Sequence, residues 1–282
     1  MTPSAHPTTG SARAAATAIP RYTWVIGVVT VACTAGVGVL GAPSEYASAI
    51  IMLLAVAFVG LPHGAYDLEV ARSLLSDRLR STWWIWFGGA YLALTALAAG
   101  LWLIAPWGGL VALLIGGAVH WGLDDLEISA RRGGTLLWLA ASRGAIPVAG
   151  PMLFASSDVA DVFGALTYEA RVSAEDVQTI GGSWLALAAP GIGVQITQAA
   201  RLSRATGLRS FFEVCVLLAW LAVAPPVLAF TLYFCFWHSV RHSMRSAVLS
   251  RPILVIHATF TRYVRAIMLP SVTSWGICLV AL

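Results

Sequence analysis

Four histidines are the residues whose type and position could do chemistry, because each lies inside or at the end of an apolar run: His63, His120, His238 and His242. Ionisable groups are costly inside a membrane-spanning stretch and are therefore functional candidates. Imidazole donors without a thiolate suit iron, zinc or copper, and the spacing alone does not choose among these metals. The alternative for each histidine is a hydrogen bond to a neighbouring helix, with no metal.

Three pairs of polar side chains are spaced four residues apart and so share a helix face: His238 with His242, His63 with Asp67, and His120 with Asp124. The first pair could bind one ion together. In the other two pairs, the carboxylate could accept the second ring N–H of a ligating histidine, on its own or a neighbouring helix, and fix its tautomer. Gly64 and Gly122, beside two of the histidines, would let helices approach closely.

The composition predicts that these side chains are carried by membrane-spanning helices. Of the 282 residues, 59% are apolar and only 11% are charged, whereas soluble domains carry about a quarter charged residues. This balance excludes a soluble enzyme, a disordered protein and a nucleic-acid binder, although the pI is near 9.1. The expected fold is an all-α, polytopic transmembrane helix bundle.

The apolar runs set the expected number of crossings at about eight or nine. They lie at about 22–41, 46–66, 83–105, 108–128, 135–155, 180–200, 211–224, 226–248 and 268–282. Residues 1–20 are expected to be a disordered tail, and residues 21–282 a single transmembrane catalytic domain. The last run is shorter than the roughly 20 residues needed to cross a bilayer, so the last helix is expected to be tilted or incomplete.

Charge divides the connectors between the runs into two alternating sets. One set holds short clusters of arginine, the only basic residue besides histidine in this chain. The other set is nearly uncharged or, at 156–178, mostly acidic. Because positive loops stay in the cytoplasm, the alternation predicts a cytoplasmic N-terminus and a multi-pass protein of the cell membrane.

The four histidines are predicted to lie at one depth in the bilayer. The helices that begin near residues 46, 108 and 226 all run toward the cytoplasm, and the histidines lie about 12 to 17 residues along them. At about 1.5 Å per residue, these positions differ in depth by about 7 Å. Four imidazoles from three helices could therefore reach one layer in the cytoplasmic half of the membrane.

Two further features of the sequence, Arg143 and the segment 156–178, allow structural predictions. Arg143 interrupts an apolar run, and it either marks a helix end or pairs with Asp124, Asp125 or Glu127. The segment 156–178 contains the pattern D-V-A-D-V-F-G-A-L, which is typical of a short amphipathic helix on the membrane surface.

Aromatic residues near the histidines could line an apolar substrate tunnel, and the candidates are Trp121, Tyr233, Phe234 and Trp237. Such residues more often form the interfacial aromatic belt or pack in the core.

Three motifs resemble those of a known family: G-L-P-H-G-A-Y-D at 60–67, H-W-G-L-D at 120–124, and Y-F-C-F-W-H-S-V-R-H at 233–242. They are similar to motifs of the Brp/Blh family of bacterial and archaeal β-carotene 15,15′-dioxygenases. A stretch at 143–154 also looks like the middle section of that family. The resemblance runs from about Glu45 to Arg265.

The resemblance implies a membrane enzyme that uses non-haem Fe(2+) and O₂ to cleave β-carotene centrally into two molecules of all-trans-retinal. Carried over by motif, the iron ligands would be His63, His120, His238 and His242. Asp67 and Asp124 match the motif carboxylates. A microbial rhodopsin is a candidate acceptor of the retinal, and the lipid bilayer is the expected surrounding.

Other functions are compatible with the same residues. A transporter or channel could use the buried His and Asp side chains as a proton or metal path. That function predicts a polar route to both membrane faces, whereas here the buried polar groups gather on one side. A lipid desaturase would need more histidine boxes, and a di-haem cytochrome would also use four histidines. An oxygenase that acts on another carotenoid or lipid also stays open.

Overall fold

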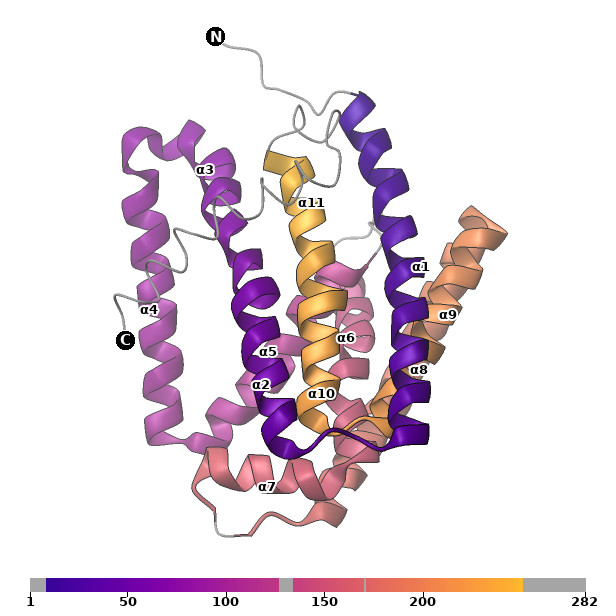
Figure 1. Cartoon of the computed structure of the whole chain (residues 1–282). Coiled ribbons are helices and arrows are strands. Elements are labelled where there is room, and N and C mark those ends of the chain that lie inside the picture. The colour runs from indigo at the N-terminus through magenta and orange to yellow at the C-terminus, as the bar shows by residue number, and fades with distance from the viewer. Residues whose placement is uncertain (1–8, 127–133, 170, 251–282) are drawn as a thin grey trace. The chain divides into compact units, whose positions relative to one another are not determined.

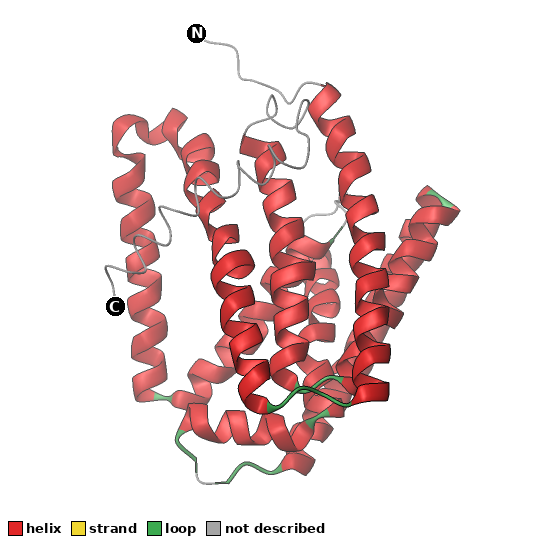
Figure 2. Cartoon of the chain, viewed as in Figure 1, coloured by secondary structure: helices red, strands yellow, loops and turns green. Residues whose placement is uncertain are grey.

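The computed structural model describes residues 9–126, 134–169 and 171–250, and the regular elements in these ranges are all helices (Figures 1 and 2). The all-helical prediction is therefore confirmed for the described part of the chain. The first helix, α1 (Thr9–Leu40), begins inside the stretch 1–20 that the sequence predicts as a disordered tail. Residues 9–20 are rich in alanine, the best helix former, which accounts for the earlier start.

Six helices among the described residues are long and apolar enough to cross a membrane: Ile19–Leu40, Val70–Ile104, Pro106–Asp125, Gly134–Phe154, Ala174–Leu202 and Arg204–Val223. A shorter apolar helix covers Glu45–Gly60. These helices indicate a membrane protein. The count of eight or nine crossings and the cytoplasmic N-terminus stay predictions, and the last expected run, 268–282, lies outside the described residues.

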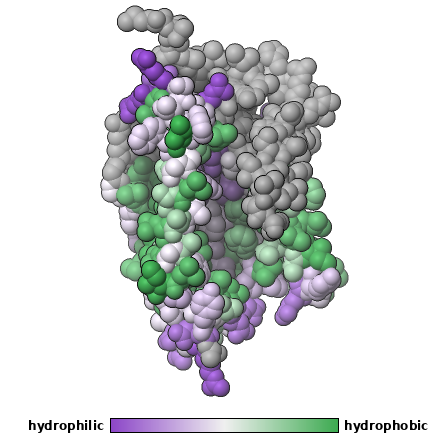
Figure 3. All heavy atoms as spheres, turned by 90° about the vertical axis from the view of Figure 1, so that its left-hand side faces the viewer, coloured by the Kyte–Doolittle hydropathy of each residue, from purple (hydrophilic) through white to green (hydrophobic). Residues whose placement is uncertain are grey.

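The surface of α4 (Trp83–Ile104) is apolar throughout its length. The helix has no buried residue, and its exposed side chains include Trp86, Leu92, Leu97 and Ile104. The face of the molecule in Figure 3 accordingly shows a broad area of hydrophobic residues. Apolar area on this scale is stable in lipid rather than in water.

The chain forms two compact units. Unit 1 comprises Met1–Thr23, Met52–Leu94 and Phe234–Leu282, and unit 2 comprises Trp24–Ile51 and Thr95–Tyr233. Of the four histidines, three belong to unit 1 and His120 belongs to unit 2.

Unit 2 is a helix bundle built around α6 (Gly134–Phe154). This helix packs on three other long helices of the unit: α5 (Pro106–Asp125), α8 (Ala174–Leu202) and α9 (Arg204–Val223). A Cβ at Gly122 would collide with the backbone of Ala140, and one at Gly144 with the backbone of Ala118. The close approach expected at Gly122 is therefore confirmed, because glycine lets the backbones of α5 and α6 meet.

Helix α7 (Ser156–Thr167) has the predicted amphipathic character. Val159, Ala160 and Phe163 are buried, while Asp158 and Asp161 are exposed. The apolar face packs on side chains of α5, α6 and α8, in a cluster that includes Leu110, Met152 and Val177. The apolar face therefore covers the protein's own core, and the position of this helix on the membrane surface stays a prediction.

Arg143 pairs with Glu213 on α9, with Nη2 and Oε1 2.8 Å apart. The side chains are only 4% and 9% exposed. This corrects the expected pairing with Asp124 or Asp125, and the third candidate, Glu127, lies outside the described residues. The reason is the packing of α6, which turns Arg143 toward α9.

Replacing Glu213 by alanine should destabilise the protein strongly, because the Arg143 guanidinium would stay buried without its counter-charge. Breaking one side of a buried pair costs about 3–5 kcal/mol. Thermal unfolding of the purified protein in detergent measures the effect. The double variant Arg143→Met with Glu213→Leu should regain most of the loss, and a single variant as stable as wild type would contradict this role.

In unit 1, the two histidine-bearing stretches depart from regular α-helix. Helix α2 (Glu45–Ala55) is followed by a π-helical turn (Val56–Gly60) and a 3₁₀ turn (Leu61–Gly64), which lead into α3 (Ala65–Leu79). A second 3₁₀ turn (Arg80–Thr82) connects α3 to α4. Later in the chain, the short α10 (Pro226–Thr231), which belongs to unit 2, continues as a π-helical stretch (Leu232–Ser239) and then as α11 (Val240–Ser250). Helix α11 packs on α3 and on the 3₁₀ turn that holds His63.

Candidate functional site

His63 lies in the 3₁₀ turn Leu61–Gly64, where its ring is held by the backbone. The N–H of Leu61 donates to the carbonyl of Val56, so a π-type bond precedes the turn. The Nδ1 atom of His63 contacts the carbonyl oxygen of Gly60. Because a carbonyl can only accept, Nδ1 must carry the proton in this bond, and Nε2 then holds the lone pair that could bind a metal.

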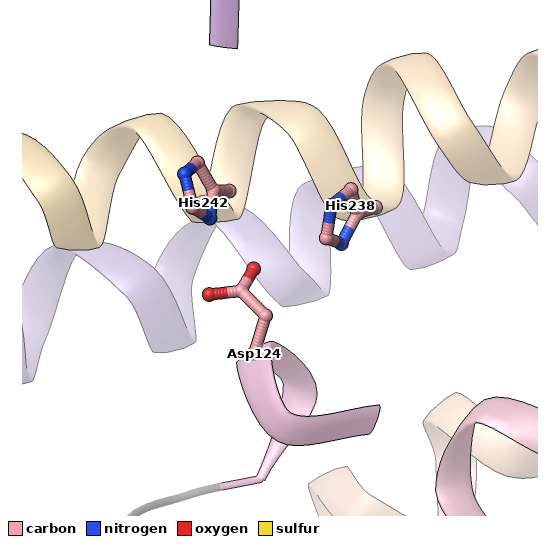
Figure 4. A group of neighbouring side chains, drawn as sticks. All are labelled: Asp124, His238 and His242. Carbon is pink, nitrogen blue, oxygen red and sulfur yellow. The ribbon is translucent and has the colours of Figure 1, made fainter. Parts of the chain in front are cut away.

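His238 and His242 lie on successive turns of one continuous helix. Figure 4 shows both imidazoles on the same side of that helix, as their spacing of four predicts. Their ring centroids are 5.8 Å apart. His238 is fully buried and His242 is half-buried.

These three imidazoles form one cluster inside unit 1. The ring centroid of His63 lies 5.8 Å from that of His238 and 5.6 Å from that of His242. The ring of Phe234 stacks on His238 and meets His63 edge-on, with centroids 6.2 and 5.4 Å away. A Cβ at Gly60 would lie 2.8 Å from the Phe234 ring, so the glycine leaves the room that this ring occupies. A triangle of imidazoles on this scale could direct three nitrogens at one ion.

Two oxygen atoms lie near Nε2 of His242. The Oγ atom of Ser246 is 3.3 Å away, and Oδ1 of Asp67 is 3.7 Å away. Asp67 therefore lies beside His242 on the neighbouring helix, which is one of the two arrangements expected for this carboxylate. His63 itself lies in the 3₁₀ turn that precedes the first residue of α3.

In unit 2, His120 and Asp124 lie in the last two turns of α5 (Asp124 is drawn in Figure 4). Successive residues turn by about 100° around an α-helix, so both project from the side opposite to Ala118 and Gly122, which face α6. His120 is exposed and Asp124 is half-buried. The structure thus groups three of the four predicted ligands in unit 1 and places His120 in unit 2.

The predicted tunnel residues lie in packed surroundings. The Trp121 ring meets Tyr233 edge-on at 5.3 Å, and Phe230 lies 6.4 Å from it. The Tyr233 hydroxyl donates to Oδ2 of Asp125 at 3.0 Å, and the Tyr233 side chain is buried. In unit 1, Trp237 is fully buried. A tunnel role for these four residues stays a prediction.

The sequence analysis did not predict two side-chain interactions of unit 2, the Arg143–Glu213 ion pair and the Tyr233–Asp125 hydrogen bond. Arg143 and Glu213 are the single charged residues of the runs 135–155 and 211–224, so their pairing could have been found by matching lone opposite charges. The hydrogen bond from Tyr233 to Asp125 could not be found in this way, because Tyr233 is uncharged and the sequence does not specify how the end of α5 packs.

Comparison with known proteins decides the family. The family model of β-carotene 15,15′-dioxygenase matches residues 54–282. The chain belongs to this family. The resemblance that the three motifs predicted is therefore confirmed, and the histidines at 63, 120, 238 and 242 all lie within the matched part.

Individual members of the β-carotene 15,15′-dioxygenase family agree with this assignment. The chain is 28% identical over 247 residues to the probable β-carotene 15,15′-dioxygenase Blh of Halobacterium salinarum, a match that covers 81% of this chain and 70% of the relative. It is 30% identical over 195 residues to the β-carotene 15,15′-dioxygenase of uncultured marine bacterium 66A03, covering 67% and 66%. For the probable β-carotene 15,15′-dioxygenase Brp of H. salinarum, the identity is 31% over 229 residues, covering 70% and 58%. No solved structure matches the chain.

Removing the Tyr233 hydroxyl should destabilise unit 2, because the Asp125 carboxylate would lose a charge-assisted hydrogen bond. Tyr233→Phe is expected to cost about 1–3 kcal/mol in thermal unfolding. Tyr168→Phe is the matched control, since Tyr168 is 76% exposed and should change nothing. Equal stability of the two variants would contradict the assigned role of the bond.

Proposed function

We propose that this chain is a membrane-embedded non-haem iron oxygenase that cleaves β-carotene with O₂ at the central 15,15′ double bond, giving two molecules of all-trans-retinal. The observation that carries the proposal is the cluster of His63, His238 and His242, which lies on two of the motifs through which the chain resembles its family. The names of the relatives give the substrate class.

The proposed ligands are the three imidazoles of unit 1 together with His120. A set of neutral nitrogen donors without thiolate suits ferrous iron. When bound, the iron supplies the chemistry that activates O₂. Iron can take more than four ligands, so four imidazoles would leave coordination positions for small molecules such as O₂.

The part played by the protein's own residues is to fix and shield the donors. The Gly60 carbonyl holds the proton of His63 on Nδ1, so that Nε2 is the donor atom. Ser246 and Asp67 stand beside His242 and would orient its ring. His238 is fully buried, which keeps bulk water from that side of the cluster. Each of these contacts is set before substrate arrives, so little reorganisation is needed.

The substrate's chemistry agrees with a membrane protein whose surface is apolar. β-Carotene is a long hydrocarbon without polar groups, so burial of apolar area would supply most of its affinity. It would reach the site from the bilayer, and the aromatic residues Trp121, Tyr233, Phe234 and Trp237 are the proposed lining of its passage. The length of that passage would select the double bond that is cleaved.

Retinal production in bacterial cells that accumulate β-carotene tests the proposal. Cells expressing the wild-type chain should lose orange colour and form about two retinals per carotene consumed, as central cleavage requires. His238→Ala should abolish retinal, because it removes a buried donor. His6→Ala is the matched control, since His6 lies outside the apolar runs, and it should behave as wild type.

Unchanged carotene with wild-type protein present in the membrane and loaded with iron would contradict β-carotene as the substrate. Other carotenoids and apocarotenals would then be assayed in the same cells. A product of eccentric cleavage would contradict the cleavage position but not the oxygenase class.

A further inference from the structure

At the end of the π-helical stretch Leu232–Ser239, the change of helix type is expected to pass over one backbone carbonyl in the regular pattern of hydrogen bonds. A π-helix bonds residue i to i+5 and an α-helix bonds i to i+4. Where the chain returns from the first pattern to the second, the step passes over one carbonyl. Because the stretch ends at Ser239, the ideal patterns place the last π-type bond between Val240 and Cys235 and the first α-type bond between Arg241 and Trp237. By this rule, the carbonyl passed over is that of Phe236.

Side chains donate to three carbonyls of this stretch. The Ser239 hydroxyl donates to the Phe234 carbonyl at 2.7 Å. The Arg241 Nε–H donates to the Trp237 carbonyl at 2.7 Å, and the guanidinium lies 5.2 Å from the centre of the Trp237 ring. The Tyr22 hydroxyl donates to the Phe236 carbonyl at 2.6 Å. Ser239 and Arg241 belong to the W-H-S-V-R-H motif but are not proposed metal ligands. Their bonds to backbone carbonyls give these two residues a structural role in the motif.

Tyr22 differs from the other two donors because it comes from a distant part of the chain. It lies on α1, 214 residues before Phe236 in sequence, and both belong to unit 1. It also precedes residue 54, where the match to the family model begins. A hydroxyl from another helix therefore donates to the carbonyl that the change from π-helix to α-helix is expected to pass over.

The π-helical stretch decides where the histidine rings point. It contains one residue more than the equivalent length of α-helix, and one residue corresponds to about 100° of rotation. A return to α-helix would turn His238 and His242 relative to the residues before the stretch by that order of angle. The cluster with His63 would then be lost, since it depends on ring centroids less than 6 Å apart.

We propose that Tyr22 is a positioning residue for the histidine cluster: its hydroxyl, bonded to the Phe236 carbonyl, holds the π-helical stretch in the register that aims His238 and His242 at the metal. The proposal rests on the proposed function, in which these histidines hold iron. Tyr22 itself touches neither the metal nor the substrate.

Tyr22→Phe tests the proposal, because it removes the hydroxyl alone. Hydrogen–deuterium exchange of the full-length, metal-free protein should show about tenfold faster exchange for peptides covering residues 234–246, as expected for the loss of one hydrogen bond. The affinity for Co(II), followed by its visible absorption, should fall about tenfold, as should kcat on β-carotene, with KM unchanged. Tyr46→Phe is the matched control, because Tyr46 is 78% exposed, and it should match wild type in every readout.

The outcomes separate this proposal from the proposed function. Unchanged exchange in Tyr22→Phe would overturn the positioning role, and so would faster exchange with unchanged Co(II) affinity and kcat. A wild-type protein that neither binds Co(II) nor cleaves β-carotene would overturn the proposed function, whatever the variant does. A loss confined to the variant, in a wild type that binds metal and is active, would support both.

Discussion

The candidate site depends on one constraint: a backbone polar group inside a membrane must have a partner. Both histidine-bearing stretches of unit 1 leave α-helical bonding, one at the turns before α3 and one before α11. In each stretch a side chain donates to a backbone carbonyl: the His63 ring to that of Gly60, and the Tyr22 hydroxyl to that of Phe236. The first bond fixes the direction of one imidazole, and we propose that the second holds the stretch that carries the other two.

In unit 2, the helices are held together by close backbone contacts at glycines and by a buried ion pair. Gly122 and Gly144 bring the backbones of α5 and α6 into contact, so that the seam is formed by main chain rather than by large side chains. The buried pair of Arg143 and Glu213 then fixes α9 on α6. Because the seam occupies one side of α5, His120 and Asp124 project from the opposite side of this helix.

Sequence patterns predicted the helical class, the close approach at Gly122 and the grouping of His63 with His238 and His242, because these follow from composition and from the positions of residues along apolar helices. They left two positions open for Asp67, beside His63 or beside a histidine of a neighbouring helix, because spacing along one helix does not specify how helices pack. They missed the π-helical stretch, which accepts a hydrogen bond from a side chain 214 residues away. The amphipathic pattern of α7 identified the helix but not its partner, because an apolar face looks the same whether lipid or protein covers it.

We propose that imidazoles of this chain bind iron, and X-ray absorption at the iron edge of the purified protein measures that coordination. We expect one iron per chain, with a first coordination sphere of nitrogen or oxygen atoms and the outer-sphere scattering that imidazole rings produce. That imidazole scattering should weaken when His242 is replaced by alanine. Iron bound through sulfur, iron without imidazole scattering, or a spectrum unchanged by the substitution would contradict iron binding by these histidines.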